Sequence, residues 1–257
     1  MPSLSIFVLG HDPAQLAAVP TLDGLRVVDL RELGLPPERA GNVYAESRFF
    51  LSDAALDVDT DYVGVVSASY DEKFGPRGLL SLTELLGEPL RARLLPRRVF
   101  APAITGPDAE WIERSESIHP GMTVLLREAA ELLPDVDLSR PTVFANSFIA
   151  AREVYVEFVH EFDRLFGVFT DRYGADFPHG YRCSNCGTVL PDGHGRYQRD
   201  RHGSYFLERL TALYFAQPRF EVIGLRREQY WTRAELARQV WRTARGQVAR
   251  YERDRVR

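Results

Sequence analysis

The sequence has no long apolar run. No segment of its 257 residues approaches the ~20 consecutive apolar residues that a membrane-spanning helix needs. The opening residues, MPSLSIFVLGHDP, also lack the basic stretch and the extended apolar core of a secretion signal. We therefore expect a cytoplasmic protein. An arginine-rich helix predicted at 232–257 could meet an anionic lipid surface, so membrane association is expected to be at most peripheral.

Basic residues are not in excess. The chain has 32 Lys and Arg against 36 Asp and Glu, a formal net charge of −4, and Lys73 is its only lysine. This balance gives no electrostatic reason to bind a polyanion, so a nucleic-acid partner is not expected. With 45% hydrophobic and 26% charged residues the composition is that of a globular protein, and the length suits a single domain over residues 1–257.

Cysteine is almost absent. The only two, Cys183 and Cys186, form one CxxC motif, and His194 and His202 follow. These four side chains suit tetrahedral Zn²⁺, and because all four positions would be filled, the ion would be structural, a clip on the irregular insertion predicted at 173–204. The alternatives are a free dithiol in a loop, or a redox pair, which the lack of a preceding strand disfavours.

Hydrophobic patterning predicts alternating strands and helices. Apolar, β-prone runs predict strands at 4–9, 25–30, 61–67, 99–103 and 142–149. Helical spacing and capping signals predict helices at 42–52, 152–169, 205–216 and 232–257, and one that ends the segment 117–133. The order strand, helix, strand in the first part of the chain is that of an α/β fold.

Several short motifs occur in a familiar order: IFVLGH, NVYAESRFFL, DYVGVVSASYDEKF, RRVFAPA, ANSFIAAREVYVEF and YFLERLTALYF. Together they resemble the bacterial glycosyltransferase-like family of capsule and O-antigen gene clusters, over about three quarters of the chain. The resemblance implies a GT-A-like (Rossmann-like) mixed sheet flanked by helices. It also implies a glycosyltransferase of hexosyltransferase type, which moves a sugar from a nucleotide-sugar donor to a glycan, lipid-linked or small-molecule acceptor.

One position departs from the family pattern. Where the family has a His-Tyr-Arg-Arg motif after its "YIG" strand, this sequence has Ser67-Ala68-Ser69-Tyr70, without the basic pair. The departure motivates an alternative function, a non-catalytic, zinc-stabilised binding or scaffold protein with the same fold.

Polar residues at predicted strand ends are the first site candidates. In an open α/β sheet the ligand crevice lies beyond the carboxyl ends of the strands. His11, Ser67, Ser69 and Asn146 would project there and are predicted to contact the donor or acceptor.

Two predicted helices each carry a carboxylate and a guanidinium. Glu46 and Arg48 lie in the first, behind Asn42, while Glu208 and Arg209 lie in the late one. An inverting transfer needs a base for the acceptor proton, so the carboxylates of Glu208 and Glu46 are the predicted catalytic groups. Asn42, Arg48 and Arg209 are predicted to bind ligand. The alternative is that each pair is an ordinary ion pair.

A catalytic metal is left open. GT-A enzymes often hold Mn²⁺ or Mg²⁺ through an Asp-x-Asp placed after a strand. Asp57-Val58-Asp59 has those letters but precedes its strand, so we interpret it as a solvated turn.

Overall fold

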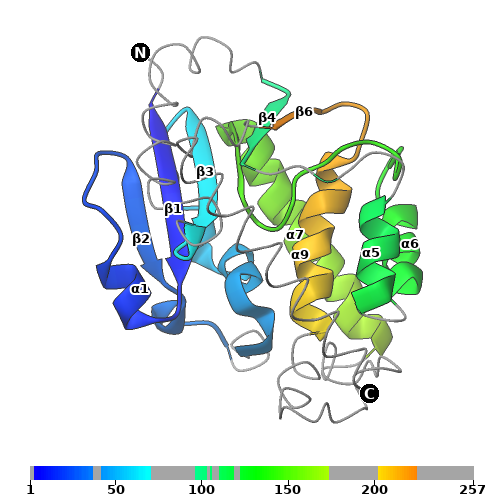
Figure 1. The fold of residues 1–257 in the computed structure, drawn as a ribbon, viewed down its shortest axis with the longest axis horizontal. Helices are drawn as coiled ribbons and strands as arrows, with labels where there is room; N and C mark the ends of the chain where they lie inside the picture. The colour runs from blue at the N-terminus through cyan, green and yellow to red at the C-terminus, as the bar shows by residue number, and fades with distance from the viewer. Residues whose placement is uncertain are drawn as a thin grey trace, which may run out of the picture.

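The computed structural model describes residues 3–36, 42–70, 96–102, 105, 110–118, 122–173 and 202–224 (Figure 1). Within these residues six strands form one sheet in the order β2-β1-β3-β5-β4-β6. The strands are β1 (Leu4–Gly10), β2 (Leu25–Asp29), β3 (Tyr62–Ser67), β4 (Arg98–Ala101), β5 (Phe148–Ala151) and β6 (Glu221–Gly224). The predicted mixed α/β sheet is confirmed.

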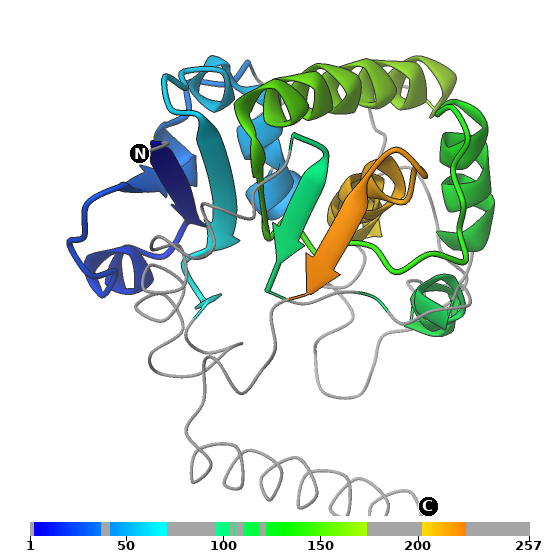
Figure 2. The same cartoon turned by 90° about the horizontal axis from the view of Figure 1, so that it is seen from above.

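Strand direction determines which residues share an edge. β1 is parallel to β2 and to β3, and β4 is parallel to β6. β5 is antiparallel to both of its neighbours, β3 and β4, so it is the single reversed strand of the described sheet. In Figure 2 the arrowheads of β3, β4 and β6 accordingly point the same way.

Helices cover both faces of the sheet. The described helical elements are α1 (Pro13–Ala17), η1 (Leu30–Glu32), η2 (Asn42–Leu51), η3 (Asp53–Ala55), α5 (Glu110–Ile118), α6 (Met122–Glu131), α7 (Arg152–Tyr173) and α9 (His202–Phe215). On one face η2 and α7 pack against the strands, and α9 packs between η2 and α6 (Figures 1 and 2). α1 contacts β1 and β2.

The core follows from the period-two alternation of the strands. Phe7 and Leu9 of β1 face the larger apolar cluster beneath η2, α7 and α9, whereas Ile6 and Val8 face a smaller cluster on the opposite side. All four are at most 4% exposed. Burial on both faces explains why the central strands read as continuous apolar runs.

Aromatic rings fill much of the larger cluster. The Phe158 ring of α7 lies 4.9 Å from that of Phe50, 5.2 Å from that of Phe148 and 5.4 Å from that of Phe215, measured between centroids. These residues come from η2, β5, α7 and α9, so one patch of rings joins four elements that are distant in sequence.

Two predicted elements differ in detail. The helix predicted at 42–52 is a 3₁₀ helix, η2. The strand predicted at 142–149 begins only at Phe148, because Ala145 takes a left-handed backbone conformation (φ 58°) that extended pairing cannot include. α5 and β6 were not predicted at all.

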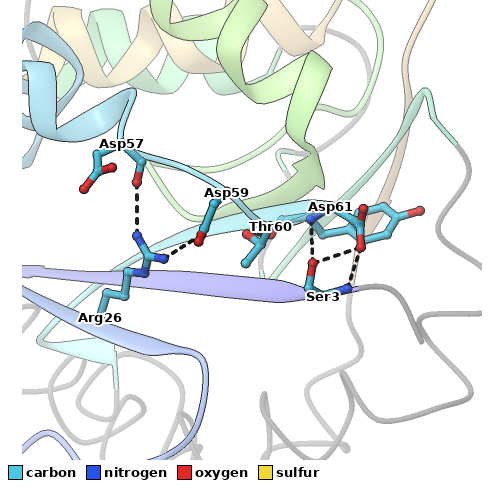
Figure 3. Close-up of polar contacts among 7 residues, drawn as sticks. Ser3, Arg26, Asp57, Asp59, Thr60 and Asp61 are labelled. Atoms are coloured by element: carbon cyan, nitrogen blue, oxygen red, sulfur yellow. Dashed lines mark hydrogen bonds and ion pairs between the residues drawn. The ribbon is translucent and has the colours of Figure 1, made fainter.

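The Asp57-Val58-Asp59 turn is where the sequence placed it, ahead of β3. Arg26 of β2 donates to the Asp57 main-chain oxygen at 3.0 Å and pairs with the Asp59 carboxylate at 2.8 Å (Figure 3). Next to it, Asp61 accepts hydrogen bonds from Ser3 at 2.7 and 2.9 Å, which lowers the pKa of its carboxyl group. Through these hydrogen bonds the solvated turn and Asp61 connect the amino ends of β1, β2 and β3.

Two predicted segments lie outside the described residues. They are the C-terminal helix predicted at 232–257 and nearly all of the insertion predicted at 173–204, of which Tyr173 ends α7 and 202–204 open α9. Among the described helices, none is both long and apolar enough to cross a membrane.

Candidate functional site at one edge of the sheet

One edge of the sheet collects the polar residues of interest. In the register of the sheet, Gly10 pairs with Asp29, Leu9 pairs with Ser67, and Val65 pairs with Phe148. The carboxyl ends of β1, β2 and β3 therefore meet the amino end of β5. Asn146 precedes β5 instead of following a strand, yet it reaches the predicted edge because β5 is reversed.

The backbone is tightly packed where β1 ends. A Cβ atom built on Gly10 would lie 2.7 Å from Cδ2 of Leu16 and 2.8 Å from Cβ of Ala68. The main-chain N–H of Ala68 also donates to Leu9 O at 2.7 Å. Only glycine fits between α1 and the loop after β3, and this contact holds the His11 loop beside the Ser67–Ser69 loop. His11 itself is exposed.

A group of charges surrounds the end of β2. Asp29 accepts 2.9 Å hydrogen bonds from the backbone N–H and the Nε of Arg31, and it pairs with Nη2 of the same side chain. These bonds, with the nearby charge of Arg48, lower the pKa of Asp29 to about 2. The hydrogen bond to Asp29 raises the pKa of Arg31, and the negative charge of the Asp12 carboxylate, which caps α1, raises it as well.

Arg48 is the buried cation of this group. Its residue is only 5% exposed, and burial lowers the pKa of its guanidinium, against the opposing effect of the Asp29 carboxylate. The Asp29 carboxylate, which belongs to another element, is thus an electrostatic partner of Arg48. Glu46 of the same 3₁₀ helix is half-buried.

The two serines after β3 bond to each other. Ser67 Oγ and Ser69 Oγ are 2.8 Å apart, and the Ser69 N–H donates to Ser67 Oγ at 3.2 Å. Ser67 is buried and Ser69 is half-buried. This compact turn occupies the place where the resembled family carries a basic pair.

Asn146 belongs to a buried chain of hydrogen bonds. Its Nδ2 donates to Ser47 Oγ of η2 at 2.9 Å, and its Oδ1 accepts from Thr211 Oγ1 of α9 at 2.6 Å. All three residues are at most 2% exposed. Both polar ends of the Asn146 amide therefore have partners within the protein, and its predicted contact with a ligand stays a prediction.

Glu208 and Arg209 lie just before Thr211 on α9. Arg209 Nη1 pairs with Glu208 Oε2 at 3.2 Å, and Arg209 Nε donates to Ser115 Oγ of α5 at 3.0 Å. The side chains of Glu208 and Arg209 are 22% and 13% exposed. The Arg209 guanidinium also covers the ring of Phe144, with Cζ 5.5 Å from its centroid.

No protein-family model and no curated protein matches this chain. Among solved structures, the apo structure of the bifunctional glycosyltransferase WbbM aligns with it at 13% identity and a TM-score of 0.48. The alignment covers 87% of this chain and 45% of that one, so this chain spans less than half of that chain's length. At this TM-score the likeness by itself assigns neither fold family nor activity.

The structure thus brings together most of the predicted residues that it describes. His11, Ser67, Ser69, Arg48 and Asn146 lie at one edge, and Glu208 and Arg209 adjoin it through Thr211 and Phe144. Asn42 opens η2. The edge also contains Asp29, Ser47, Thr211 and Phe144, which sequence reasoning missed; the position of Asp29 near the end of the strand predicted at 25–30 was the one available signal.

The predicted zinc ligands lie at the boundary of the description. Cys183, Cys186 and His194 are outside the described residues, and His202 is the first residue of α9. In the described ranges, no group of three or more His, Cys, Asp or Glu side chains could hold a metal ion. The zinc site stays a prediction.

Proposed function

We propose that this chain is a glycosyltransferase, which moves a sugar from a nucleotide-sugar donor to a glycan, lipid-linked or small-molecule acceptor, in a GT-A-like fold. The observation that carries the proposal is the meeting of charged and hydroxyl side chains from β2, η2 and β3 with Glu208 of α9 along one sheet edge. Open α/β sheets bind ligands at such an edge, and the motif order described above points to the same chemistry.

The charged group at β2 suits the nucleotide end of a donor. A diphosphate needs fixed cations, and Arg31 and Arg48 supply guanidinium groups that remain protonated at neutral pH. Because Arg48 is buried, its charge is less screened than that of a surface arginine. Asp29 is ionised under the same conditions and can accept hydrogen bonds from ribose hydroxyls.

Glu208 is the proposed base. As the acceptor oxygen bonds to the anomeric carbon of the donor sugar, the carboxylate takes the hydroxyl proton, and the bond to the nucleoside diphosphate breaks. The 3.2 Å ion pair to Arg209, itself fixed by Ser115, orients the carboxylate. Glu46 is the second candidate for this base. Mn²⁺ or Mg²⁺ would help to neutralise the leaving diphosphate, and no step depends on a metal ligand among the described residues.

A thermal-shift screen tests the donor. The purified protein is melted with nucleoside diphosphates and nucleotide sugars, each with and without Mn²⁺. A ligand at about one hundred times its Kd stabilises the native state by about 2.7 kcal/mol, which raises Tm by roughly 5–10 °C at this chain length. No shift with any nucleotide would refute the proposal, and dependence on Mn²⁺ would reveal a metal at the donor.

The base is tested by a matched pair of variants. Glu208→Gln is expected to lower transfer by two to four orders of magnitude while the nucleotide shift is retained. Glu221→Gln is the control, because Glu221 of β6 is exposed and pairs with Arg98 of β4; it should change neither transfer nor the nucleotide shift. Unchanged turnover in Glu208→Gln would eliminate Glu208 and leave Glu46 to be tested in the same way.

A second candidate function is a non-catalytic binding or scaffold protein. Two observations favour it: Ser67 and Ser69 bond to each other in place of a basic pair, and both polar ends of the Asn146 amide have partners within the protein. Structural zinc on Cys183, Cys186, His194 and His202 would belong to this function as well as to the first. Metal analysis of the purified protein tests the zinc prediction, since a filled site gives one zinc per chain. The second function itself is tested by the nucleotide screen, in which it predicts no thermal shift with any nucleotide or nucleotide sugar.

A further inference from the structure

Phe144 is an exposed aromatic ring beside the proposed active edge. Its exposed fraction is 44%, and it is the one aromatic among the large exposed apolar side chains of the described residues. The others are aliphatic and lie elsewhere: Val27 on β2, Leu56 after η3 and Val124 on α6. A solitary exposed apolar residue needs no explanation by itself, so the way in which this ring is held is what distinguishes it.

The ring is backed by an anchored cation. The Arg209 guanidinium lies over it at 5.5 Å, and it is itself held by Glu208 at 3.2 Å and by Ser115 Oγ at 3.0 Å. Ser115 is 2% exposed and in turn donates to Trp111 O at 2.6 Å. The partner of the ring is therefore pinned to α5 as well as to α9.

The backbone on both sides of Phe144 is also fixed. Before it, the buried Thr142 donates through Oγ1 to Ala212 O at 2.6 Å and exchanges hydrogen bonds with Thr105. After it, Ala145 has a φ of 58°, strained for a residue with a Cβ, and Asn146 is locked to Ser47 and Thr211. Such strain persists only where the surroundings enforce it. The Phe144 ring is therefore held in a fixed, exposed position.

We propose that Phe144, with Arg209 and Glu208 beside it, is a stacking platform for a sugar ring of the acceptor. A pyranose has an apolar C–H face and a rim of hydroxyl groups, which match an aromatic face next to a guanidinium and a carboxylate. This inference rests on the proposed function and names its acceptor class, a preformed glycan or glycoside.

Position along the edge separates this platform from the nucleotide end. Asp29 ends β2, and Phe144 precedes β5, which is the third strand along the sheet from β2. At about 4.8 Å per strand the separation along the edge is about 14 Å, so the nucleotide and the platform need not compete for space. The proposed base Glu208 contacts Arg209 on the platform side, as transfer to an acceptor requires.

Saturation-transfer NMR with free methyl glycosides tests the platform. The probes are the α and β anomers of glucose, galactose, mannose and N-acetylglucosamine, recorded with and without the nucleoside diphosphate that stabilises the protein best. The wild type should bind at least one glycoside. Phe144→Ala should weaken that binding about fivefold or more, and Phe144→Tyr, which keeps the ring, should bind as the wild type does. Val124→Ala, at 55% exposure on α6, is the control.

The outcomes separate this inference from the proposed function. Loss of glycoside binding in Phe144→Ala, with its melting temperature and nucleotide shift unchanged, supports the platform. A wild type that binds no glycoside in either condition overturns it, even if nucleotides bind. If Phe144→Ala instead abolishes the nucleotide shift, the ring stacks a base and the inference is wrong. Glycoside binding without any nucleotide shift retains the platform and refutes the transfer proposal.

Discussion

Replacing Asn146 with alanine is expected to destabilise the protein by about 3 kcal/mol. The variant removes two hydrogen bonds, to Ser47 Oγ at 2.9 Å and from Thr211 Oγ1 at 2.6 Å, in a region where all three residues are at most 2% exposed. Each bond contributes about 0.5–1.5 kcal/mol, and the two hydroxyl groups would remain buried with less than their full set of partners. A small cavity adds to the loss.

A double-mutant cycle separates the hydrogen bonds from the cavity. Thr211→Val keeps the volume and removes the donor, so by itself it should destabilise by about 1–2 kcal/mol. In the Asn146→Ala background the same change should have almost no effect, a coupling of about 1–2 kcal/mol. Urea denaturation followed by circular dichroism measures both, provided that the m value is constant.

Thr170→Val on α7 is the matched control. Among the residues that the structure describes, Thr170 Oγ1 bonds only to main-chain oxygens within its own helix, those of Phe166 and Gly167 at 3.0 and 2.8 Å. Its replacement should change stability by no more than about 0.5 kcal/mol. The stabilising role of the Asn146 hydrogen bonds is refuted if Asn146→Ala destabilises by less than about 1 kcal/mol, or if Thr211→Val has the same effect in both backgrounds.

Four further substitutions test the packing of the protein and the charges around the edge. Gly10→Ala places a Cβ within 2.8 Å of atoms of Leu16 and Ala68 and should destabilise the protein by about 1–3 kcal/mol. Gly167→Ala in α7, where an added Cβ would have no atom within 4 Å, should stabilise it by up to about 1 kcal/mol. Chemical denaturation compares the two variants. Phe158→Ala should destabilise by about 3–5 kcal/mol in the same assay, because the ring contacts three elements. Asp29 has a folded pKa of about 2 against about 3.9 when unfolded, so its contribution to stability is present above pH 4 and is lost as pH falls through 2. Asp29→Asn should therefore flatten the dependence of the free energy of unfolding on pH over that window. An unchanged dependence would show that the Arg31 hydrogen bonds do not lower the pKa of Asp29.

Local patterns predicted the strands that are buried and the helices that are strongly amphipathic. β1, β2, β3, α6, α7 and α9 all appear within a few residues of their expected positions, because apolar runs and helical spacing report burial directly. β6 was not predicted because its four residues, EVIG, are too few to show a clear strand pattern. α5 was missed because it is short and its sequence, EWIERSESI, is mostly polar.

The site was only partly readable for a different reason. The sequence places polar residues at strand ends, but which ends meet is decided by pairing between distant segments. Asn146 was placed at the correct edge on the wrong premise, that it follows a parallel strand. Ser47 and Thr211 carry no local signal, since their roles exist only once η2 and α9 lie on either side of Asn146.

The reversed direction of β5 has a consequence for how this protein could be altered. After β5 the chain passes from Ala151 directly into α7, so no connecting loop is available there for insertions. The connection that can vary is the one ahead of the strand, where the exposed Phe144 lies between Thr142 and Asn146, both of which are held by buried hydrogen bonds. Under the proposed function, acceptor preference should therefore change most readily through substitution of Phe144, with Thr142 and Asn146 kept.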